Sequence, residues 1–516
     1  MRLLCFLVLG GLFGGCDAAV QTKSGSGDTQ GLDLPNIVVL FADDLGYGDL
    51  GSYGHPNIRT PNLDALAARG QRWTDFYMAA SVCSPSRAAL LTGRLPVRTG
   101  LYGDVIRVFF PDEAEGFPAD ELTLAEALKR HGYRTGIFGK WHLGDSADAL
   151  PTRHGFDSWL GVPYSNDMNW VGQPEFEELV RLSLVNDIET RTRLFADRAA
   201  KYAAPEAAYW EVPLVHSHRR SDGVFEDSLE QPTDQAELTQ RYTEAAIAFM
   251  EASEDAPFFV YLPYTMPHTP LFRSDAFAGQ SIGGRYGDTV EEIDWSVGEI
   301  QRALRRLGLT EETLVVFTSD NGPWLTMREE GGSAGLLRNG KGTTFEGGMR
   351  VPAIFSWPGK IAPGVTSEIG ASLDLFTTVM ALLDEEAETA LDGLDLGPTL
   401  FSGAASPRSE MPYYRGGTLY AYRQGLWKLH LVTEGAYGQA PPKTVHETPQ
   451  LFHLGRDPAE RFDVADQHPE VVDALRQAVD AHRASITKKP SRFDQRVALV
   501  QQRMQQEASP ASRNEP

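Results

Sequence analysis

The sequence predicts an α/β fold: a large mixed, mostly parallel sheet flanked by helices, followed by a smaller C-terminal antiparallel sheet with a helix. Two observations support this prediction. Unbroken runs of apolar β-forming residues recur between helical patterns, as expected for strands that are buried on both faces of a sheet. Shorter, closely spaced strand patterns follow towards the C-terminus, which is typical of antiparallel pairing.

The N-terminal segment has the features of an export signal. Residues 1–15 contain Arg2 and then an apolar run that is too short to span a membrane. Phe13-Gly14-Gly15-Cys16 is similar to a bacterial lipoprotein cleavage box, so we predict that residues 1–15 are removed and that Cys16 is lipidated. Ordinary secretion is the alternative. Residues 16–34 predict a flexible tether, and we expect an exported protein, periplasmic or at the cell surface.

The large domain is predicted at residues 35–405, and three of its strands are followed by polar side chains. Because ligands of open α/β sheets bind beyond the carboxyl ends of strands, we expect these side chains to meet in one site. Adjacent carboxylates there suit a hard cation, whereas a solvated turn is the alternative. The strands and the residues after them are 37–41 with Asp43 and Asp44, 257–262 with His268, and 313–318 with Asp320 and Asn321.

Helices and further strands occupy the intervals between these three strands. Helices are predicted at residues 62–70, 122–131, 236–250, 290–307 and 373–383, and strands at 73–77, 133–138 and 351–357. Residues 169–234 are polar and irregular, apart from helices predicted at residues 176–185 and 187–202, and predict an insertion that shapes a rim. Residues 406–487 are predicted to form an α+β subdomain, and residues 488–516 a poorly packed polar tail.

Cys83 is the one cysteine outside the N-terminal segment, so it is predicted to lack a partner for an internal disulfide. Such a cysteine is usually a small buried apolar residue. Here, however, Pro85 and Arg87 follow at short offsets and lead into a helix-like run. The start of a helix favours an anion, and Arg87 adds a positive charge to it.

The charge balance restricts the kinds of partner. The formal net charge is −23, which argues against nucleic acid, because binding to phosphates needs clustered Lys and Arg. It does not exclude a small anionic substrate, since a few local cations can outweigh a distant negative field.

Several blocks of the sequence resemble one family. Cys83-Ser84-Pro85-Ser86-Arg87, extended through Thr92-Gly93-Arg94, resembles the first signature of the formylglycine-dependent (type I) sulfatases. Residues 132–144 are similar to their second signature. Further similar blocks follow in the family order, and residues 163–167 look most like the branch of arylsulfatase A and the N-acetylgalactosamine-6-sulfatases. These further blocks are Asp43-Asp44 and residues 267–270, 320–322 and 340–348.

The resemblance implies an alkaline-phosphatase-like sheet and an enzyme that hydrolyses sulfate monoesters of carbohydrates or aryl alcohols. It also implies that a maturation enzyme, recognising Pro85 and Arg87, oxidises Cys83 to formylglycine. The hydrated aldehyde has two hydroxyls: one attacks sulfur, and the other then loses its proton as sulfate leaves. Arg87 would hold this diol.

A metal ion is implied as well. The resemblance implies one calcium ion, with magnesium as the weaker alternative. Its ligands would be the modified Cys83 with Asp43, Asp44, Asp320 and Asn321. The ion would lower the pKa of the diol and polarise a sulfate oxygen.

The remaining implied residues would bind sulfate and transfer protons. Lys140 and Lys341 would bind the sulfate oxygens, where charge has to be stabilised. His142 would deprotonate the second hydroxyl, and His268 or Lys341 would protonate the leaving alcohol. Ser165 would hydrogen-bond either the sulfate or His142.

Two alternatives are distinguished by residue type. A phosphatase or phosphodiesterase of the same superfamily would have a Ser or Thr nucleophile and usually two zinc ions held by His and Asp. A non-catalytic protein that binds sulfated glycans would have lost some of Cys83, Lys140, His142 and His268. The natural substrate is left open: sulfated polysaccharide fragments are expected for an exported enzyme, and residues 104–120 and 170–234 are expected to select among them.

Overall fold

The computed structural model describes residues 34–508, except residues 113–115, 172–173, 186–188, 191–192, 194–195, 197–199, 203–204, 254 and 388. The predicted export signal, and the predicted tether up to residue 33, lie outside the described residues. In the part of the chain that is described, no helix combines the length and the apolar character needed to cross a membrane.

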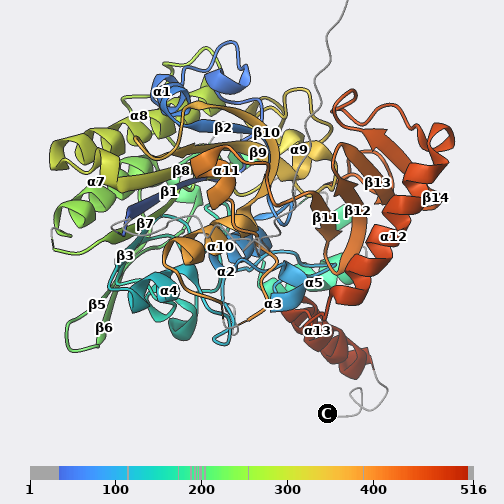
Figure 1. Ribbon diagram of the computed structural model, residues 1–516. Helices are drawn as coiled ribbons and strands as arrows, with labels where there is room; N and C mark the ends of the chain where they lie inside the picture. The colour runs from blue at the N-terminus through green and yellow to red at the C-terminus, as the bar shows by residue number, and fades with distance from the viewer. Residues whose placement is uncertain are drawn as a thin grey trace, which may run out of the picture. The chain divides into compact units, whose positions relative to one another are not determined.

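Ten strands in the described part of the chain form one mixed sheet. They are β1 (Asn36–Ala42), β2 (Gln71–Tyr77), β3 (Arg134–Phe138), β4 (Ser158–Gly161), β5 (Leu214–Arg219), β6 (Phe225–Glu230), β7 (Phe258–Pro263), β8 (Thr313–Ser319), β9 (Arg350–Ser356) and β10 (Gly364–Ala371). Their order in the sheet is β10-β2-β9-β8-β1-β7-β3-β4-β5-β6 (Figure 1).

The centre of this sheet is parallel. β1 pairs in parallel with β7 on one side and with β8 on the other, and β3 pairs in parallel with β7. The carboxyl ends of these four strands therefore meet at one edge of the sheet. β9 runs antiparallel to β8, and β5 and β6 form an antiparallel hairpin. The predicted fold class, a mixed sheet flanked by helices with a second smaller sheet, is confirmed.

Helices cover both faces of the large sheet, because successive side chains of a buried strand point to opposite faces. Ile37 and Phe41 of β1 pack into the core on one face of the sheet, together with a first group of helices. Val38 and Leu40 pack into the core on the other face, together with a second group. The first group is α2 (Cys83–Thr92), α4 (Leu124–Arg130), α10 (Ser372–Leu382) and α11 (Gly397–Ser402), and the second is α1 (Pro61–Arg69), α7 (Leu238–Glu251) and α8 (Gly284–Leu307).

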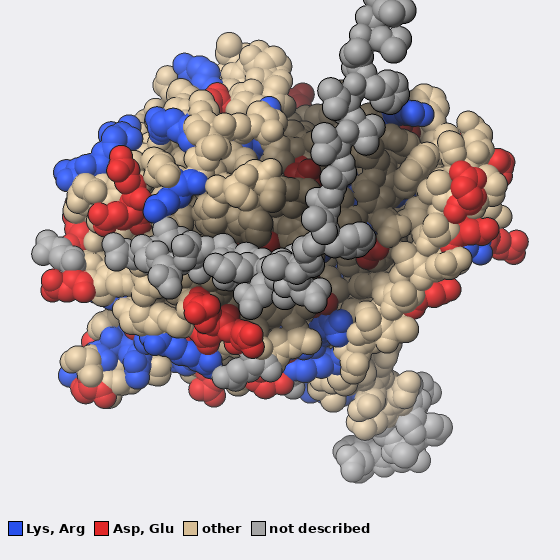
Figure 2. Space-filling model, in the orientation of Figure 1, with Lys and Arg blue, Asp and Glu red and all other residues tan. Residues whose placement is uncertain are grey.

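The second sheet lies after the large one in the chain and is antiparallel throughout. Its strands β11 (Glu410–Arg415), β12 (Thr418–Gln424), β13 (Trp427–Thr433) and β14 (Thr444–His453) pair in chain order. Helix α12 (Pro469–Ser485) packs Leu475 and Val479 into the same core. Acidic and basic side chains intermingle over most of the face shown in Figure 2, and acidic ones predominate on the right, over this C-terminal part. The short helices are α3 (Pro96–Thr99), α5 (Phe176–Leu184) and α9 (Glu346–Met349).

Two regions differ from the sequence predictions. Residues 169–234 were predicted to be irregular apart from helices, and the helix predicted at residues 176–185 is confirmed as α5. The stretch also contains the hairpin β5–β6 at the edge of the large sheet, which was not predicted because most of its side chains face solvent and leave only a weak apolar alternation. The tail from residue 488 was predicted to pack poorly, which is wrong for helix α13 (Arg492–Ala508). Its apolar residues are few but lie on one face, so Val497 and Val500 are buried against Val180 of α5.

A network of buried charges joins the second sheet to the large domain. Lys428 of β13 lies 2.9 Å from a carboxylate oxygen of Glu346, in α9, and 2.9 Å from one of Glu460, and all three side chains are fully buried. Glu346 also accepts hydrogen bonds from the hydroxyls of Tyr77 (2.6 Å) and Tyr413 (2.7 Å). Burial alone would raise the pKa of Glu346, but the neighbouring Lys428 holds it below its ordinary value. The network is therefore stable only while its charges are matched.

This matching makes Lys428 a critical residue for stability. Lys428→Met would leave Glu346 and Glu460 buried without their shared cation, so we expect the free energy of unfolding to fall by about 3–5 kcal/mol in urea denaturation. Lys360→Met, at an exposed position, is the control and should change it by less than about 0.5 kcal/mol. Equal stability of both variants would contradict the structural role of the network.

Candidate functional site

The polar residues that follow the central strands lie together, because the parallel strands end at one edge of the sheet. Asp43 and Asp44 follow β1, and Asp320 follows β8. Cys83 approaches them as the first residue of α2. Ligand atoms of these four buried residues all lie within 4.8 Å of one another. Three segments that are separated in the sequence thus form one compact acidic cluster.

The turn after β1 aims both carboxylates into this cluster. Asp44 has φ of 63°, a left-handed conformation that aspartate tolerates better than most residues. Its backbone N–H donates to Asp320 Oδ1 at 3.1 Å, and its Oδ1 accepts from Asn321 Nδ2 at 2.7 Å. The amide oxygen of Asn321 is buried and has no hydrogen-bond partner in the described structure.

This donor set fits a divalent metal ion. Three carboxylates and a buried amide oxygen without a partner are the oxygen ligands that calcium and magnesium prefer. Burial raises the pKa of Asp44, while Lys341 opposes that rise. Buried acids at such short separation need positive charge nearby to remain ionised, which a bound cation would supply.

Arg87 and Lys140 supply part of that positive charge. The guanidinium of Arg87 lies 2.8 Å from Asp320 and 3.4 Å from Asp43, and it also donates to the carbonyl oxygen of Lys140 at 3.0 Å. Burial would lower the pKa of Arg87, but Asp320 and Asp43 raise it above its ordinary value. Lys140 Nζ donates to Asp43 Oδ2 at 2.5 Å and to Ser165 Oγ at 3.2 Å.

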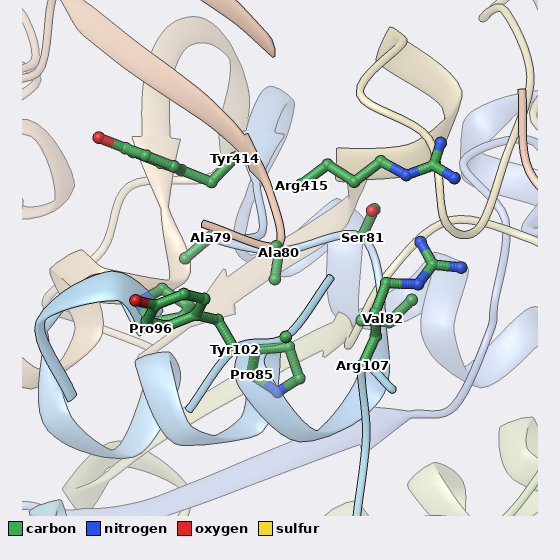
Figure 3. A pocket seen from close by; sticks show the side chains of 12 residues that line it. Ala79, Ala80, Ser81, Val82, Pro85, Pro96, Tyr102, Arg107, Tyr414 and Arg415 are labelled. Carbon is green, nitrogen blue, oxygen red and sulfur yellow. The ribbon is translucent and has the colours of Figure 1, made fainter. Parts of the chain in front are cut away.

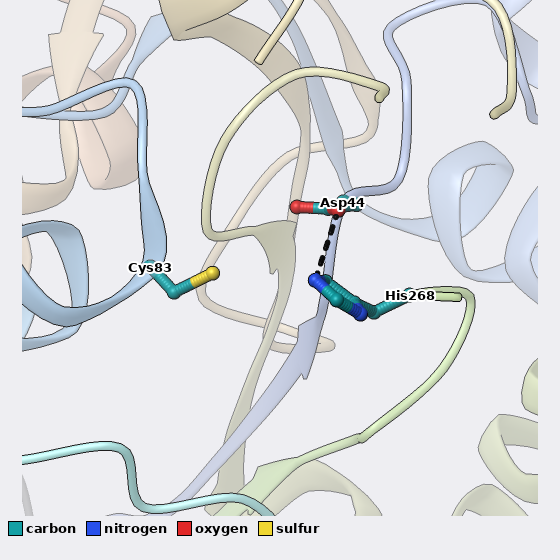
Figure 4. Close-up of side chains that lie close together, drawn as sticks. All are labelled: Asp44, Cys83 and His268. Atoms are coloured by element: carbon teal, nitrogen blue, oxygen red, sulfur yellow. Dashed lines mark ion pairs between the residues drawn. The ribbon is translucent and has the colours of Figure 1, made fainter. Parts of the chain in front are cut away.

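Lys341 and His268 approach the cluster from another side. Lys341 Nζ donates to Asp44 Oδ2 at 2.8 Å, and His268 Nε2 lies 3.6 Å from the same oxygen. Figure 4 shows Asp44, Cys83 and His268 converging, with the His268 ring turned towards Asp44. Burial and then Lys341 lower the pKa of His268 to about 3, so its imidazole is neutral in this arrangement. Burial would lower the pKa of Lys341, but Asp44 raises it well above its ordinary value.

His142 is placed as a neutral base. Its Nε2 lies 2.9 Å from the carbonyl oxygen of Phe109, to which only a protonated nitrogen can donate, so Nδ1 has the free lone pair. Nδ1 is buried and has no partner in the described structure. Burial first, then Lys140 and Arg87, lower the pKa of His142 well below its ordinary value. Ser165 was expected to bond sulfate or His142, but here its hydroxyl contacts Lys140 and lies 3.4 Å from His268 Nε2.

The Cys83 thiol itself is a poor nucleophile in this setting. Its side chain is buried, and Sγ lies 3.6 Å from Asp43 Oδ1. Burial raises the pKa of the thiol above its ordinary value, and the lysines only partly oppose this. Because the thiolate is the reactive form of cysteine, an unmodified Cys83 would be unreactive at neutral pH.

The structure adds an aromatic residue that sequence reasoning missed. The ring of Trp324 lies 4.7 Å from Lys341 Nζ and 5.2 Å from the ring of His268. Its position in the sequence was a signal, since it follows Asn321-Gly322-Pro323 directly after a predicted strand. Its contacts with Lys341 depend on a loop that returns from later in the chain, which no local pattern reveals.

Family models match two parts of the chain. A model described as "Sulfatase" matches residues 35–385, and one described as "C-terminal region of aryl-sulfatase" matches residues 406–514. The chain is 43% identical over 468 residues to arylsulfatase A of Bos taurus, covering 86% of this chain and 86% of that protein. It is 41% identical over 486 residues to N-acetylgalactosamine-6-sulfatase of Mus musculus, covering 88% and 86%.

Solved structures of similar fold include two with 28% sequence identity. PsFucS1 sulfatase from Pseudoalteromonas sp. matches with a TM-score of 0.73, covering 88% of this chain and 90% of that chain. Ps i-CgsB in complex with k-i-k-neocarrahexaose matches with a TM-score of 0.69, covering 89% and 94%.

The unpartnered amide oxygen of Asn321 leads to a test of the metal site. Calcium is expected to bind the protein in titration calorimetry and to raise its melting temperature. Asn321→Ala removes one oxygen ligand and should weaken calcium binding about ten-fold or more. Asn57→Ala, which changes an exposed asparagine, is the matched control. Unchanged calcium affinity in Asn321→Ala would exclude this residue as a ligand.

Proposed function

The chain belongs to the sulfatase family and is a sulfuric ester hydrolase, and on this premise we propose that it releases sulfate from sulfated carbohydrates with formylglycine derived from Cys83 and a calcium ion. The observation that supports the proposal best is the position of Cys83, at the start of α2 and with its sulfur within 4.8 Å of an oxygen of each of three buried carboxylates. One relative is an N-acetylgalactosamine-6-sulfatase, and one similar structure is in complex with a neocarrahexaose, which supports a sugar substrate.

The proposed modification explains why a buried, unreactive thiol occupies the site. When Cys83 is oxidised and hydrated, it supplies one hydroxyl to attack sulfur and a second whose deprotonation releases sulfate. Arg87, which contacts Asp43 and Asp320 across the cluster, would orient this group. A maturation enzyme is the proposed partner for the oxidation.

The charged residues around Cys83 would bind the substrate. Asp43, Asp44, Asp320 and Asn321 would hold calcium, which when bound would polarise a sulfate oxygen. Lys140 and Lys341 now donate to Asp43 and Asp44, so their ammonium groups already point into the volume where sulfate oxygens would lie.

Two proton transfers complete the reaction. His142 has a free, unprotonated Nδ1 and would accept the proton of the second hydroxyl. The leaving oxygen needs a proton, and either Lys341 or His268 would supply it, because both reach the same oxygen of Asp44. Lys341 already carries a proton in this arrangement, whereas the neutral imidazole of His268 would first have to take one up. Ser165, whose hydroxyl contacts both Lys140 and His268, would hold these two side chains at a fixed distance from each other.

The two alternative functions have less support. A phosphatase would need a Ser or Thr at position 83 and usually a mixture of His and Asp ligands for two zinc ions. The cluster instead contains Cys83 and the three carboxylates of Asp43, Asp44 and Asp320. A non-catalytic glycan-binding protein would not need His142 with a free base nitrogen beside the cluster. All the predicted site residues are present.

Mass spectrometry of the Cys83 peptide tests the proposal. Protein made together with a maturation enzyme should contain an aldehyde at position 83, detected as a mass loss or by an aldehyde-reactive probe. Cys83→Ala should lower the rate of 4-nitrophenyl sulfate hydrolysis by about 10⁴-fold or more while leaving the melting temperature nearly unchanged. Full activity from protein with an unmodified thiol would refute the mechanism.

Export and lipid anchoring are a separate part of the proposal. The sequence of residues 1–16 supports removal of a signal and lipidation of Cys16. Labelled palmitate should be incorporated by the wild-type chain in a bacterial host and not by Cys16→Ser. Secretion without label would show that the protein is exported but not anchored.

A further inference from the structure

The site has an aromatic wall on the side where the leaving alcohol must lie. Trp324 contacts Lys341 and His268, the two candidates for protonating the leaving oxygen. The ring of Tyr437 lies 5.3 Å from that of Trp324, and its side chain is 46% exposed. Because the sulfate end of the substrate is directed towards Cys83, the alcohol end must extend from Lys341 and His268 along these two rings.

Tyr437 reaches this place from the C-terminal subdomain. The loop between β13 and β14 is held by Arg415, which donates to the carbonyl oxygen of Gly435 at 2.8 Å and pairs with Glu434 at 3.2 Å. Tyr437 has φ of 53°, an unusual backbone conformation for a large residue. Gly342, directly after Lys341, permits the close approach: a Cβ there would lie 3.0 Å from Tyr437 Cε2. The wall is therefore built into the fold next to Lys341.

Arg107 lies beside this wall with an unmatched charge. Its guanidinium lies 5.5 Å from the ring centre of Tyr437, and it donates to the carbonyl oxygen of Gly342 at 3.2 Å. Figure 3 shows Arg107 and Arg415 extending on the same side past Ser81. Arg415 has Glu434 as its ion-pair partner, whereas no carboxylate in the described part of the chain pairs with Arg107.

An unmatched arginine at this position is unexpected for the chain as a whole. The net charge is −23, so acidic side chains are abundant. A backbone carbonyl satisfies one N–H of Arg107 but leaves its charge and its other donors available. Arg107 also lies close enough to Arg415 to lower the pKa of Arg415 further, after the effect of burial. An anion beside Arg107 would relieve this repulsion.

We propose that Arg107, Trp324 and Tyr437 form a subsite for the alcohol part of the substrate, in which the two rings contact the sugar and Arg107 binds a second anionic group on it. This group is a sulfate or a carboxylate, since both accept hydrogen bonds from guanidinium. The inference rests on the proposed function, because the direction of the subsite follows from where the leaving oxygen is protonated. It predicts that the enzyme prefers sugars with two anionic groups.

Competition against 4-nitrophenyl sulfate measures this preference. The inhibition constants of N-acetylgalactosamine 6-sulfate and its 4,6-disulfate are compared, and likewise those of a 6-sulfated disaccharide containing glucuronate and of its methyl ester. We expect the doubly anionic member of at least one pair to bind about ten-fold more tightly. Which pair shows the preference identifies sulfate or carboxylate as the second group.

Variants separate recognition of charge from a structural role of Arg107. Arg107→Ala should bring the ratio of inhibition constants close to one, and Arg107→Lys should restore part of it. Tyr437→Ala should weaken both members of a pair alike, because a ring contacts the sugar and not the charge. Arg305→Ala removes the same charge from the exposed face of α8 and should leave the ratio unchanged. No preference in either pair, or equal weakening of both members by Arg107→Ala, would overturn the subsite.

A further measurement distinguishes the subsite from the proposed function. The same sugars are titrated calorimetrically into Cys83→Ala, in which the proposed nucleophile is absent. A preference for the doubly anionic sugar there, without hydrolysis of 4-nitrophenyl sulfate by the matured wild type, would uphold the subsite and refute the proposed reaction. Hydrolysis by the matured wild type, without any preference for the doubly anionic sugar, would uphold the proposed reaction and refute the subsite.

Discussion

The burial of three carboxylates at the ends of β1 and β8 is the constraint on which the rest of the site depends. Charges this close and this far from water repel one another strongly, so each must be compensated. The protein compensates them with three buried, positively charged side chains that contact the carboxylates directly, so the numbers of negative and positive side chains are equal. The pairs are Asp43 with Lys140, Asp44 with Lys341, and Asp320 with Arg87.

This balance explains how one cluster can accept both a metal ion and an anionic ester. A neutral set of six side chains that takes up a divalent cation has two positive charges in excess, and a sulfate monoester anion returns only one of them. The remaining charge would favour an anionic nucleophile at position 83 and disfavour release of the ester before it reacts. In the proposed reaction, the same lysines would change partner, from carboxylate to sulfate, without leaving the cluster.

The sequence was sufficient for the parts of the site that are local to strand ends. The apolar runs that became β1, β7 and β8 are buried on both faces, so their boundaries, and the polar residues after them, could be recognised from composition alone. The contacts made by irregular segments could not be recognised in this way. The bond between His142 and the Phe109 carbonyl, and the approach of Tyr437 to Trp324, depend on loops whose paths are set by packing. Helix α13 was missed because few of its residues are apolar.

The second sheet is a part of the site as well as a neighbour of it. Lys341 and Glu346 belong to one short segment, and Glu346 is anchored by Lys428 of β13. Glu346 follows Lys341 by five residues, so its contact with Lys428 ties the backbone that presents Lys341 to the C-terminal sheet. The same sheet presents Tyr437 through the loop that Arg415 holds. In the proposed subsite, substitutions in this loop would change the surface that the alcohol meets while the carboxylates and their cations stay fixed, so substrate choice would vary independently of the reacting centre.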